Sequence, residues 1–222
     1  MMRDFVKEAA SQPRREYHIY NDINVLIKDF PQSEEVDIPA LLSKIEYTLP
    51  RYYFDNIDVV YVGEFEDLGD RNAAFLDGAI YMTSTEPTTH DMLENIVHEV
   101  AHSLEGDHGD MLYGDQKVIS EFLGKRERLR LILEQEGYTI PEEFYEQTEY
   151  NRNFDKFLMN AVGYPTLTYL TMGLFVSPYG ATSLREYFAN AFEHFYINDR
   201  EDVKKVSPQV YLKIDYLHKT GE

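Results

Sequence analysis

One segment of the sequence has residue types and spacing that suit metal chemistry: His98-Glu99-Val100-Ala101-His102. The two histidines are four positions apart, so on a helix both imidazoles project from the same side, about one turn from each other. That arrangement lets both reach one tetrahedral zinc ion. Glu99 lies beside them, where a carboxylate can accept a proton from a water molecule that zinc has acidified to a pKa of about 7. The segment is therefore typical of zinc-assisted hydrolysis with Glu99 as the general base.

A catalytic zinc ion needs a third protein ligand, and three residues are candidates. His108 stands at the spacing of the metzincin pattern HExxHxxGxxH, but Glu105 occupies the position of its glycine. Glu121 follows His102 after 18 intervening residues, as in thermolysin-like gluzincins, without the other residues of those motifs. Glu186 lies 84 residues beyond His102. Spacing alone leaves all three open.

The motif lies in a segment, about 91 to 104, whose apolar spacing predicts a helix with one buried face. Thr88 with Asp91 offers a capping-box start, and glycines at 106, 109 and 114 predict that the helix ends soon after the motif. The apolar positions of the predicted buried face are Leu93, Ile96, Val97, Val100, Ala101 and Leu104.

The elements around this helix predict an α+β fold. A helix over 38–49 ends at Pro50, and strands are expected over 57–65 and 78–83. Everything after Thr88 reads as helix: a charged helix over 116–136, an apolar stretch within 139–178 interrupted by Gly163 and Pro165, a helix over 183–196 and a closing helix. Neither a repeat nor a linker is visible, so we expect a single domain, 1–222, with a small sheet lobe and a larger helical lobe.

Composition narrows the function classes. The 222 residues carry 21 Lys plus Arg and 40 Asp plus Glu, a net charge of −19, which argues against binding nucleic acid or an anionic membrane surface. Without cysteine, any metal must be held by His, Asp or Glu. The first 20 residues lack the apolar core of a signal peptide, and no apolar run is long enough to span a membrane. We therefore expect a soluble cytoplasmic protein, with signal-independent export left open.

A second motif introduces a family resemblance. Tyr179-Gly180 and the run from Glu186 to Phe192, EYFANAF, resemble the catalytic domain of anthrax lethal factor and the related Pro-Pro endopeptidases. Those proteins combine HExxH with a tyrosine seven residues ahead of a glutamate in an E-[FY]-F-A-x-[AS]-F helix, and Tyr179 precedes Glu186 by seven. Segments 126–138 and 207–211 also look similar, so the resemblance covers about 78 to 217.

The resemblance implies a zincin fold with the motif helix at the junction of the two lobes. It further implies a zinc metalloendopeptidase, with one zinc per chain held by His98, His102 and Glu186 and a protein or peptide substrate. Glu99 would be the general base, and Tyr179 would donate its hydroxyl to the oxyanion. The strand at 78–83 would be the edge that pairs with the extended substrate. The gap between His102 and Glu186 is about twice the usual length, and the excess predicts a helical insertion at about 139–176.

Two other functions remain open at this point. The chain could be a non-catalytic binding or assembly protein that keeps a zincin fold, although an intact Glu99 argues for catalysis. It could also be a metzincin-like peptidase that uses His108. A local alternative concerns Glu186 itself, because Ser183 and Glu186 form a capping box and the carboxylate could serve only the helix N-terminus. The sequence leaves the oligomeric state open.

Overall fold

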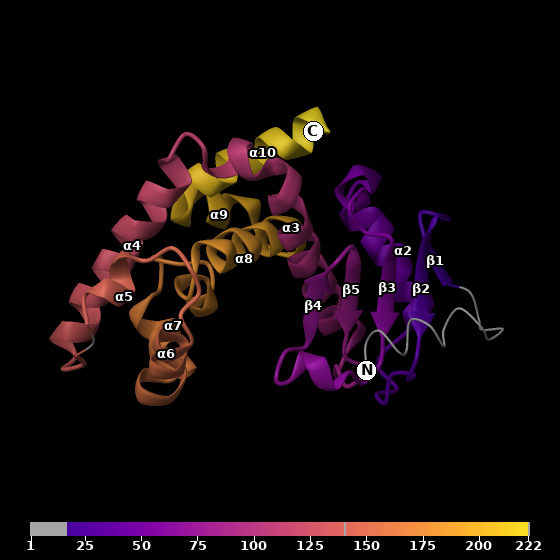
Figure 1. Cartoon of the computed structure of the whole chain (residues 1–222), viewed down its shortest axis with the longest axis horizontal. Helices are drawn as coiled ribbons and strands as arrows, with labels where there is room; N and C mark the ends of the chain where they lie inside the picture. Colours follow the sequence, from indigo (N-terminus) through magenta and orange to yellow (C-terminus); the bar gives the residue numbers. More distant parts are fainter. Residues whose placement is uncertain (1–16, 140, 222) are drawn as a thin grey trace. The chain divides into compact units, whose positions relative to one another are not determined.

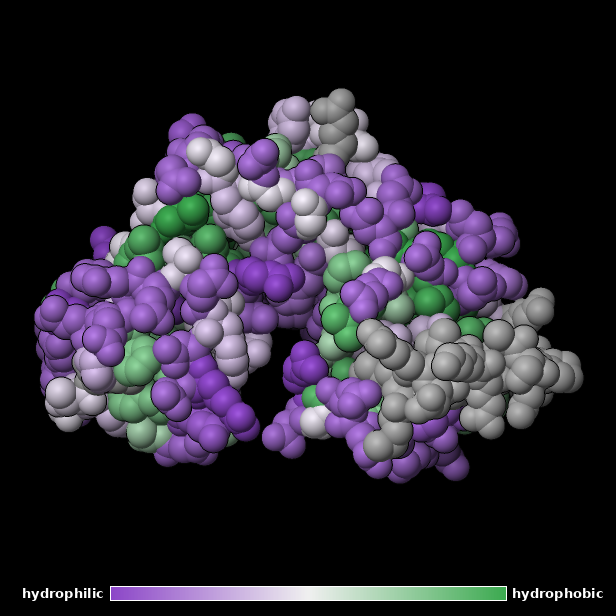
Figure 2. Space-filling view, viewed as in Figure 1, coloured by the Kyte–Doolittle hydropathy of each residue, from purple (hydrophilic) through white to green (hydrophobic). Residues whose placement is uncertain are grey.

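The computed structural model describes residues 17–139 and 141–221, and the chain divides into two compact units, 1–104 and 105–222 (Figure 1). The predicted α+β class is confirmed, because one mixed sheet of five strands is accompanied by many helices. Most of the signal-peptide prediction concerns residues 1–16, which lie outside the described residues. Among the helices of the described ranges, none is both long and apolar enough to cross a membrane. Figure 2 shows that the described residues on the face in view are mostly hydrophilic, in keeping with a net charge of −19.

The sheet of the first unit has the strand order β1-β2-β3-β5-β4. The β2–β3 and β3–β5 pairs are parallel, whereas β1–β2 and β4–β5 are antiparallel. Figure 1 shows β4 at one end of the sheet. The strands are β1 (Tyr17–Ile19), β2 (Ile23–Ile27), β3 (Val59–Val62), β4 (Ala73–Leu76) and β5 (Ala79–Met82).

The strands predicted over 57–65 and 78–83 are β3 and β5, but the expected edge is wrong. β5 lies between β3 and β4, so the sheet ends at β4, a strand that the sequence analysis did not predict. The reason is a two-residue hairpin at Asp77 and Gly78, which both have positive φ (50° and 76°), as a type I′ turn requires. This hairpin places Ala73–Leu76 beside β5 as a further strand.

Helices of the first unit cover the sheet and connect its strands. α2 (Ile38–Thr48) is capped by Asp37, whose side chain accepts the Ala40 N–H at 3.0 Å, and it ends before Pro50 as predicted. Short 3₁₀ turns follow, η1 (Arg51–Phe54) and η2 (Glu66–Leu68). The sheet residues on one face are wholly buried: Val60, Val62, Ile80 and Met82.

α3 (Thr89–Tyr113) carries the motif and runs longer than predicted. Its residues up to Leu104 belong to the first unit, and those from Glu105 onward belong to the second. The helix continues through Gly106 and Gly109, because single glycines weaken a helix by only about 1 kcal/mol each and need not end it. It ends before Gly114, whose N–H still donates to Asp110 O at 2.8 Å.

The second unit is a helical assembly around an aromatic core. Its helices outside the insertion are α4 (Lys117–Gln135), α8 (Leu184–Ile197), α9 (Arg200–Val206) and α10 (Pro208–Thr220). The predicted helices over 116–136 and 183–196 are thus confirmed. The core residues, each at most 2% exposed, include Phe122, Leu129, Tyr187, Phe188, Phe192, Phe195, Val210 and Ile214.

The segment expected as an insertion is built from short helical pieces. They are α5 (Glu143–Glu146), α6 (Arg152–Lys156), a π-helical turn η3 (Phe157–Val162), α7 (Tyr164–Leu170) and a 3₁₀ turn η4 (Pro178–Ala181). The predicted interruption is confirmed, because Gly163 has φ +84° and separates η3 from α7. Phe154 anchors the segment, since its ring stacks near Phe144 and lies 4.3 Å from the Arg126 guanidinium carbon.

Candidate metal centre

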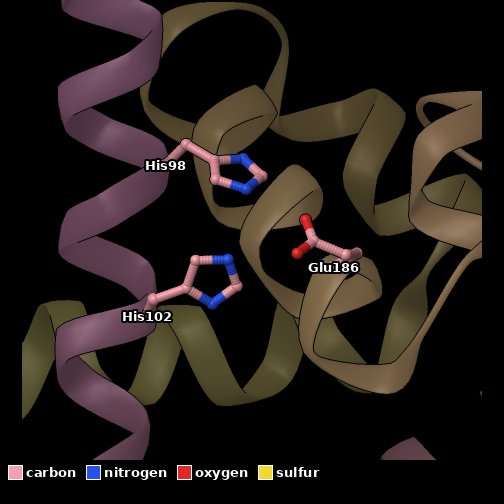
Figure 3. Close-up of side chains that lie close together, drawn as sticks. All are labelled: His98, His102 and Glu186. Atoms are coloured by element: carbon pink, nitrogen blue, oxygen red, sulfur yellow. The ribbon is translucent and has the colours of Figure 1, made fainter. Parts of the chain in front are cut away.

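His98, His102 and Glu186 form a group that could hold a metal ion (Figure 3). The histidines come from α3 and the glutamate from α8, and one ligand atom from each lies within 4.8 Å of the others. Among the residues that the structure describes, this is the one such group of three His, Asp or Glu side chains. The structure therefore brings together the three residues that the resemblance implied as ligands.

The start of α3 and its apolar face determine where the two histidines point. Thr88 Oγ1 accepts the N–H groups of His90 and Asp91, both at 3.2 Å, which confirms the predicted cap. All six residues of the predicted buried face are at most 6% exposed. Because that face is covered, the half-buried His98 and His102 share another side of the helix, with ring centroids 4.9 Å apart.

Glu99 is 9% exposed, and its carboxylate has a partner on the sheet. Its Oε2 atom accepts the backbone N–H of Phe75 in β4 at 2.6 Å. A hydrogen bond from a backbone amide to a charged carboxylate is strong. Because the strand fixes the position of the amide, the bond also limits the movement of the carboxylate. Glu99 is thus tied to the edge strand by one oxygen.

Glu186 stands in the first turn of α8, where two roles were possible for its side chain. Ser183 caps the helix, and its hydroxyl accepts the Glu186 N–H at 3.2 Å. Ser183 therefore provides the cap through its own side chain. The Glu186 carboxylate faces the two imidazoles instead (Figure 3). Asn190 donates to the Glu186 carbonyl at 2.8 Å within the same helix.

Tyr179 lies in η4, just before α8. Burial is the main cause that raises its pKa well above the ordinary value, and the negative charges of Glu186 and Asp155 raise the pKa further. The hydroxyl of Tyr179 therefore remains protonated at neutral pH and can donate a hydrogen bond.

The loop that joins Tyr179 to α8 is anchored from two sides. Gly180 packs on α8, where a Cβ atom would be in ordinary van der Waals contact with Tyr187 Cα at 3.6 Å. From α4, the buried Arg126 donates through Nη1 to the carbonyls of Ala181 (2.8 Å) and Thr182 (3.3 Å). Arg126 also donates to the Phe144 carbonyl. Nothing in the charged sequence of α4 indicated this buried guanidinium.

The other two candidate ligands do not join the group. Glu121 is used inside the second unit, where its carboxylate accepts the Tyr187 hydroxyl at 2.9 Å and the Gln209 N–H at 3.0 Å. His108 is on α3, beyond the motif, and is absent from the metal-competent group of the described residues. Glu105, at the position of the metzincin glycine, accepts from Arg185 at 2.8 Å and from Tyr113 at 2.7 Å.

The insertion contributes a polar cluster near Tyr179 that the sequence analysis missed. Tyr150 donates to Asp155 at 2.6 Å, and Tyr164 also makes a side-chain hydrogen bond to Asp155. Burial and the bond to Asp155 raise the pKa of Tyr150 to about 12. All three residues also contribute to the raised pKa of Tyr179. The cluster was missed because its members lie apart in the sequence, in a loop and in two short helices.

No family model, curated protein or solved structure matches the chain. Which metal fits is therefore judged from the ligand types and their separation. Two imidazoles and one carboxylate are the ligands of many catalytic zinc sites, with a fourth position left for water. Ligand atoms around tetrahedral zinc are about 3.4 Å apart, given bonds of about 2.0–2.1 Å. The ligand atoms of the group lie within 4.8 Å of one another, and their donor types are those that zinc binds, so the residues fit zinc.

Proposed function

We propose that the chain is a zinc-dependent metalloendopeptidase with a zincin-like fold, of the kind represented by the lethal factor catalytic domain and the Pro-Pro endopeptidases. One observation carries the proposal: the metal-competent group His98, His102 and Glu186 has the buried carboxylate of Glu99 at the next position of the same helix. Metal-assisted peptide hydrolysis needs a metal with an open coordination position and a base beside it, and three protein ligands with an adjacent carboxylate support both requirements.

The residues would divide the chemistry as follows. His98, His102 and Glu186 would hold the zinc, which would supply Lewis-acid chemistry toward a carbonyl and a bound water. Glu99 accepts a proton from the attacking water and returns it to the leaving amine. Tyr179, protonated because burial raises its pKa, donates to the oxyanion.

A peptide substrate also needs a place to bind, and β4 offers one. β4 is at the end of the sheet, and an extended peptide can add to such an edge through main-chain hydrogen bonds. The residues before the hairpin, rather than 78–83, would therefore hold the substrate backbone. Backbone pairing of this kind leaves specificity to pockets for the side chains.

The rival function is a non-catalytic binding protein with a structural metal. Structural zinc sites usually have four protein ligands, whereas the group here has three. A structural site also has no use for a base, yet Glu99 is buried and held by a hydrogen bond from β4. Both features favour catalysis.

The test combines metal content with peptide cleavage. Purified protein, titrated with zinc, should bind close to one equivalent and cleave members of a mixed peptide library. Glu99→Gln should keep the zinc and lose activity by at least about 10²-fold, because the amide cannot accept the proton. Glu94→Gln makes the same change on the same helix and should leave both zinc content and activity unaltered. A parent protein that binds zinc and cleaves no peptide would overturn the proposal in favour of a binding protein.

A further inference from the structure

We propose that the backbone N–H of Phe75 positions the Glu99 carboxylate for its work as the general base, so that the edge strand β4 is part of the active site. The inference rests on the proposed function and adds a positioning residue that the sequence motif does not contain. Its basis is the hydrogen bond of 2.6 Å from Phe75 N to Glu99 Oε2.

The pairing of β4 with β5 explains why this N–H is available. Thr83 N donates to Asn72 O at 2.8 Å, and the register continues with Phe75 opposite Ile80. In an antiparallel pair, hydrogen-bonded and non-hydrogen-bonded positions alternate, so Phe75 and Ile80 form a non-hydrogen-bonded pair. The N–H and C=O of Phe75 therefore point away from β5, toward the open edge.

The bond to Phe75 restricts what Glu99 can do. Glu99 is 9% exposed, so its carboxylate has little water to satisfy it and depends on partners in the protein. A backbone donor in a strand cannot rotate away, and it holds Oε2 in one place. The other oxygen, Oε1, is left to accept the proton. A base positioned in this way needs little reorganisation in the transition state.

The same bond limits how a substrate can pair with β4. An extended peptide that adds to the open edge finds the Phe75 carbonyl as an acceptor, but the Phe75 N–H already has a partner. The peptide must therefore donate to Phe75 O without receiving a bond from Phe75 N. This one-sided pairing would fix the register of the peptide beside Glu99.

The first test compares Phe75→Pro with Phe75→Ala. Proline removes the N–H, and an edge position whose N–H is outside the ladder is one of the few strand sites that accept proline. Alanine removes the side chain but keeps the N–H. We expect kcat for Phe75→Pro to be about 10²-fold below that for Phe75→Ala, with equal KM and equal zinc content. Equal kcat in two folded, zinc-loaded variants would overturn the inference while leaving the endopeptidase proposal intact.

A second measurement does not depend on catalysis or on a variant of Phe75. The amide proton of Phe75 should resonate downfield in the parent protein, because it donates to a carboxylate in a short bond. In Glu99→Gln it should move upfield, while the amide of Ala73, which faces the same edge, should stay in place. An unchanged Phe75 resonance would show that the bond is absent in solution and would overturn the inference even if peptides are cleaved.

Discussion

Arg185 forms a 2.8 Å salt bridge with Glu105, and each of the two stands close in sequence to a candidate metal ligand. Glu105 is three residues after His102 on α3, and Arg185 immediately precedes Glu186 on α8. The Glu105 side chain is only 8% exposed and also accepts the Tyr113 hydroxyl. The buried carboxylate of Glu105 thus holds the first turn of α8 against the C-terminal half of α3.

Arg185→Gln should therefore weaken zinc binding without touching a ligand. Hydrogen bonds to charged groups contribute about 1.5–3 kcal/mol, and the half-exposed Arg185 loses part of that to solvent, so we expect about a tenfold weaker zinc affinity. Arg130→Gln is the matched control, since Arg130 pairs with Glu127 and Glu134 on the surface of α4. Competition with a zinc chelator measures both variants. Equal affinities for the two variants would show that the salt bridge does not support the site.

Alanine substitutions should separate the ligands from the other candidates. His98→Ala, His102→Ala and Glu186→Ala should each weaken zinc binding by orders of magnitude, because each removes one of three donors. His108→Ala and Glu121→Ala should keep the zinc, although Glu121→Ala should lower stability by removing the acceptor of the Tyr187 hydroxyl and of the Gln209 N–H. Zinc titration and thermal unfolding distinguish the two effects. Loss of zinc on His108→Ala, with Glu186→Ala unaffected, would favour the metzincin-like alternative.

Tyr179→Phe should lower kcat by about 10²–10³-fold with little change in KM, because an oxyanion donor acts mainly in the transition state. Steady-state kinetics on a cleaved library peptide measures both constants. Tyr169→Phe removes the hydroxyl of an exposed tyrosine on α7 and serves as the control. A higher KM at unchanged kcat would instead assign Tyr179 to substrate packing.

Lys125 should make the free energy of unfolding increase as the pH rises above neutral. Its ammonium group is buried, donates to the Leu174 carbonyl at 2.6 Å and lies over the Tyr187 ring. Burial lowers its pKa from 10.5 to about 8 in the folded protein. Between these two values the unfolded chain holds a proton that the folded chain has released, so stability rises with pH.

The measurement is the unfolding free energy in urea at pH 7.5 and pH 9.5. The difference between the parent protein and Lys125→Met should grow by about 1–2 kcal/mol in favour of the parent over this interval. Titrations elsewhere in the chain cancel in the difference. Parallel pH profiles for the two proteins would show that Lys125 keeps its ordinary pKa after folding.

Local patterns predicted much of the fold. The apolar spacing of α3, the Pro50 stop of α2 and the break at Gly163 are effects of neighbouring residues, and all three were predicted correctly. Strand β4 was missed although Asp77-Gly78 is a hairpin signal. Strand β2 was missed because its partner β3 lies more than 30 residues away, and β1 was missed with it because β1 pairs with β2.

Some residues of the candidate site could be identified from local sequence patterns, and others could not. His98, Glu99 and His102 could be identified because their spacing matches one helical turn, and Glu186 because an aromatic pattern surrounds it. The Phe75 N–H could not be identified, since every residue except proline has that group and only the fold selects one. The guanidinium of Arg126 was also hidden, because a charged residue in a charged helix is normally solvated.

Two glycines within α3, Gly106 and Gly109, could be replaced by alanine to stabilise the helix. A methyl group added at Gly106 or Gly109 would meet no atom within 4 Å, and alanine favours a helix over glycine by about 1 kcal/mol per position. The helix that presents the histidines is therefore intrinsically weakest in the turn directly after His102. Amide protons in that turn should exchange with solvent faster than those at the motif. Two added methyl groups, at Gly106 and Gly109, should therefore stiffen this stretch of α3.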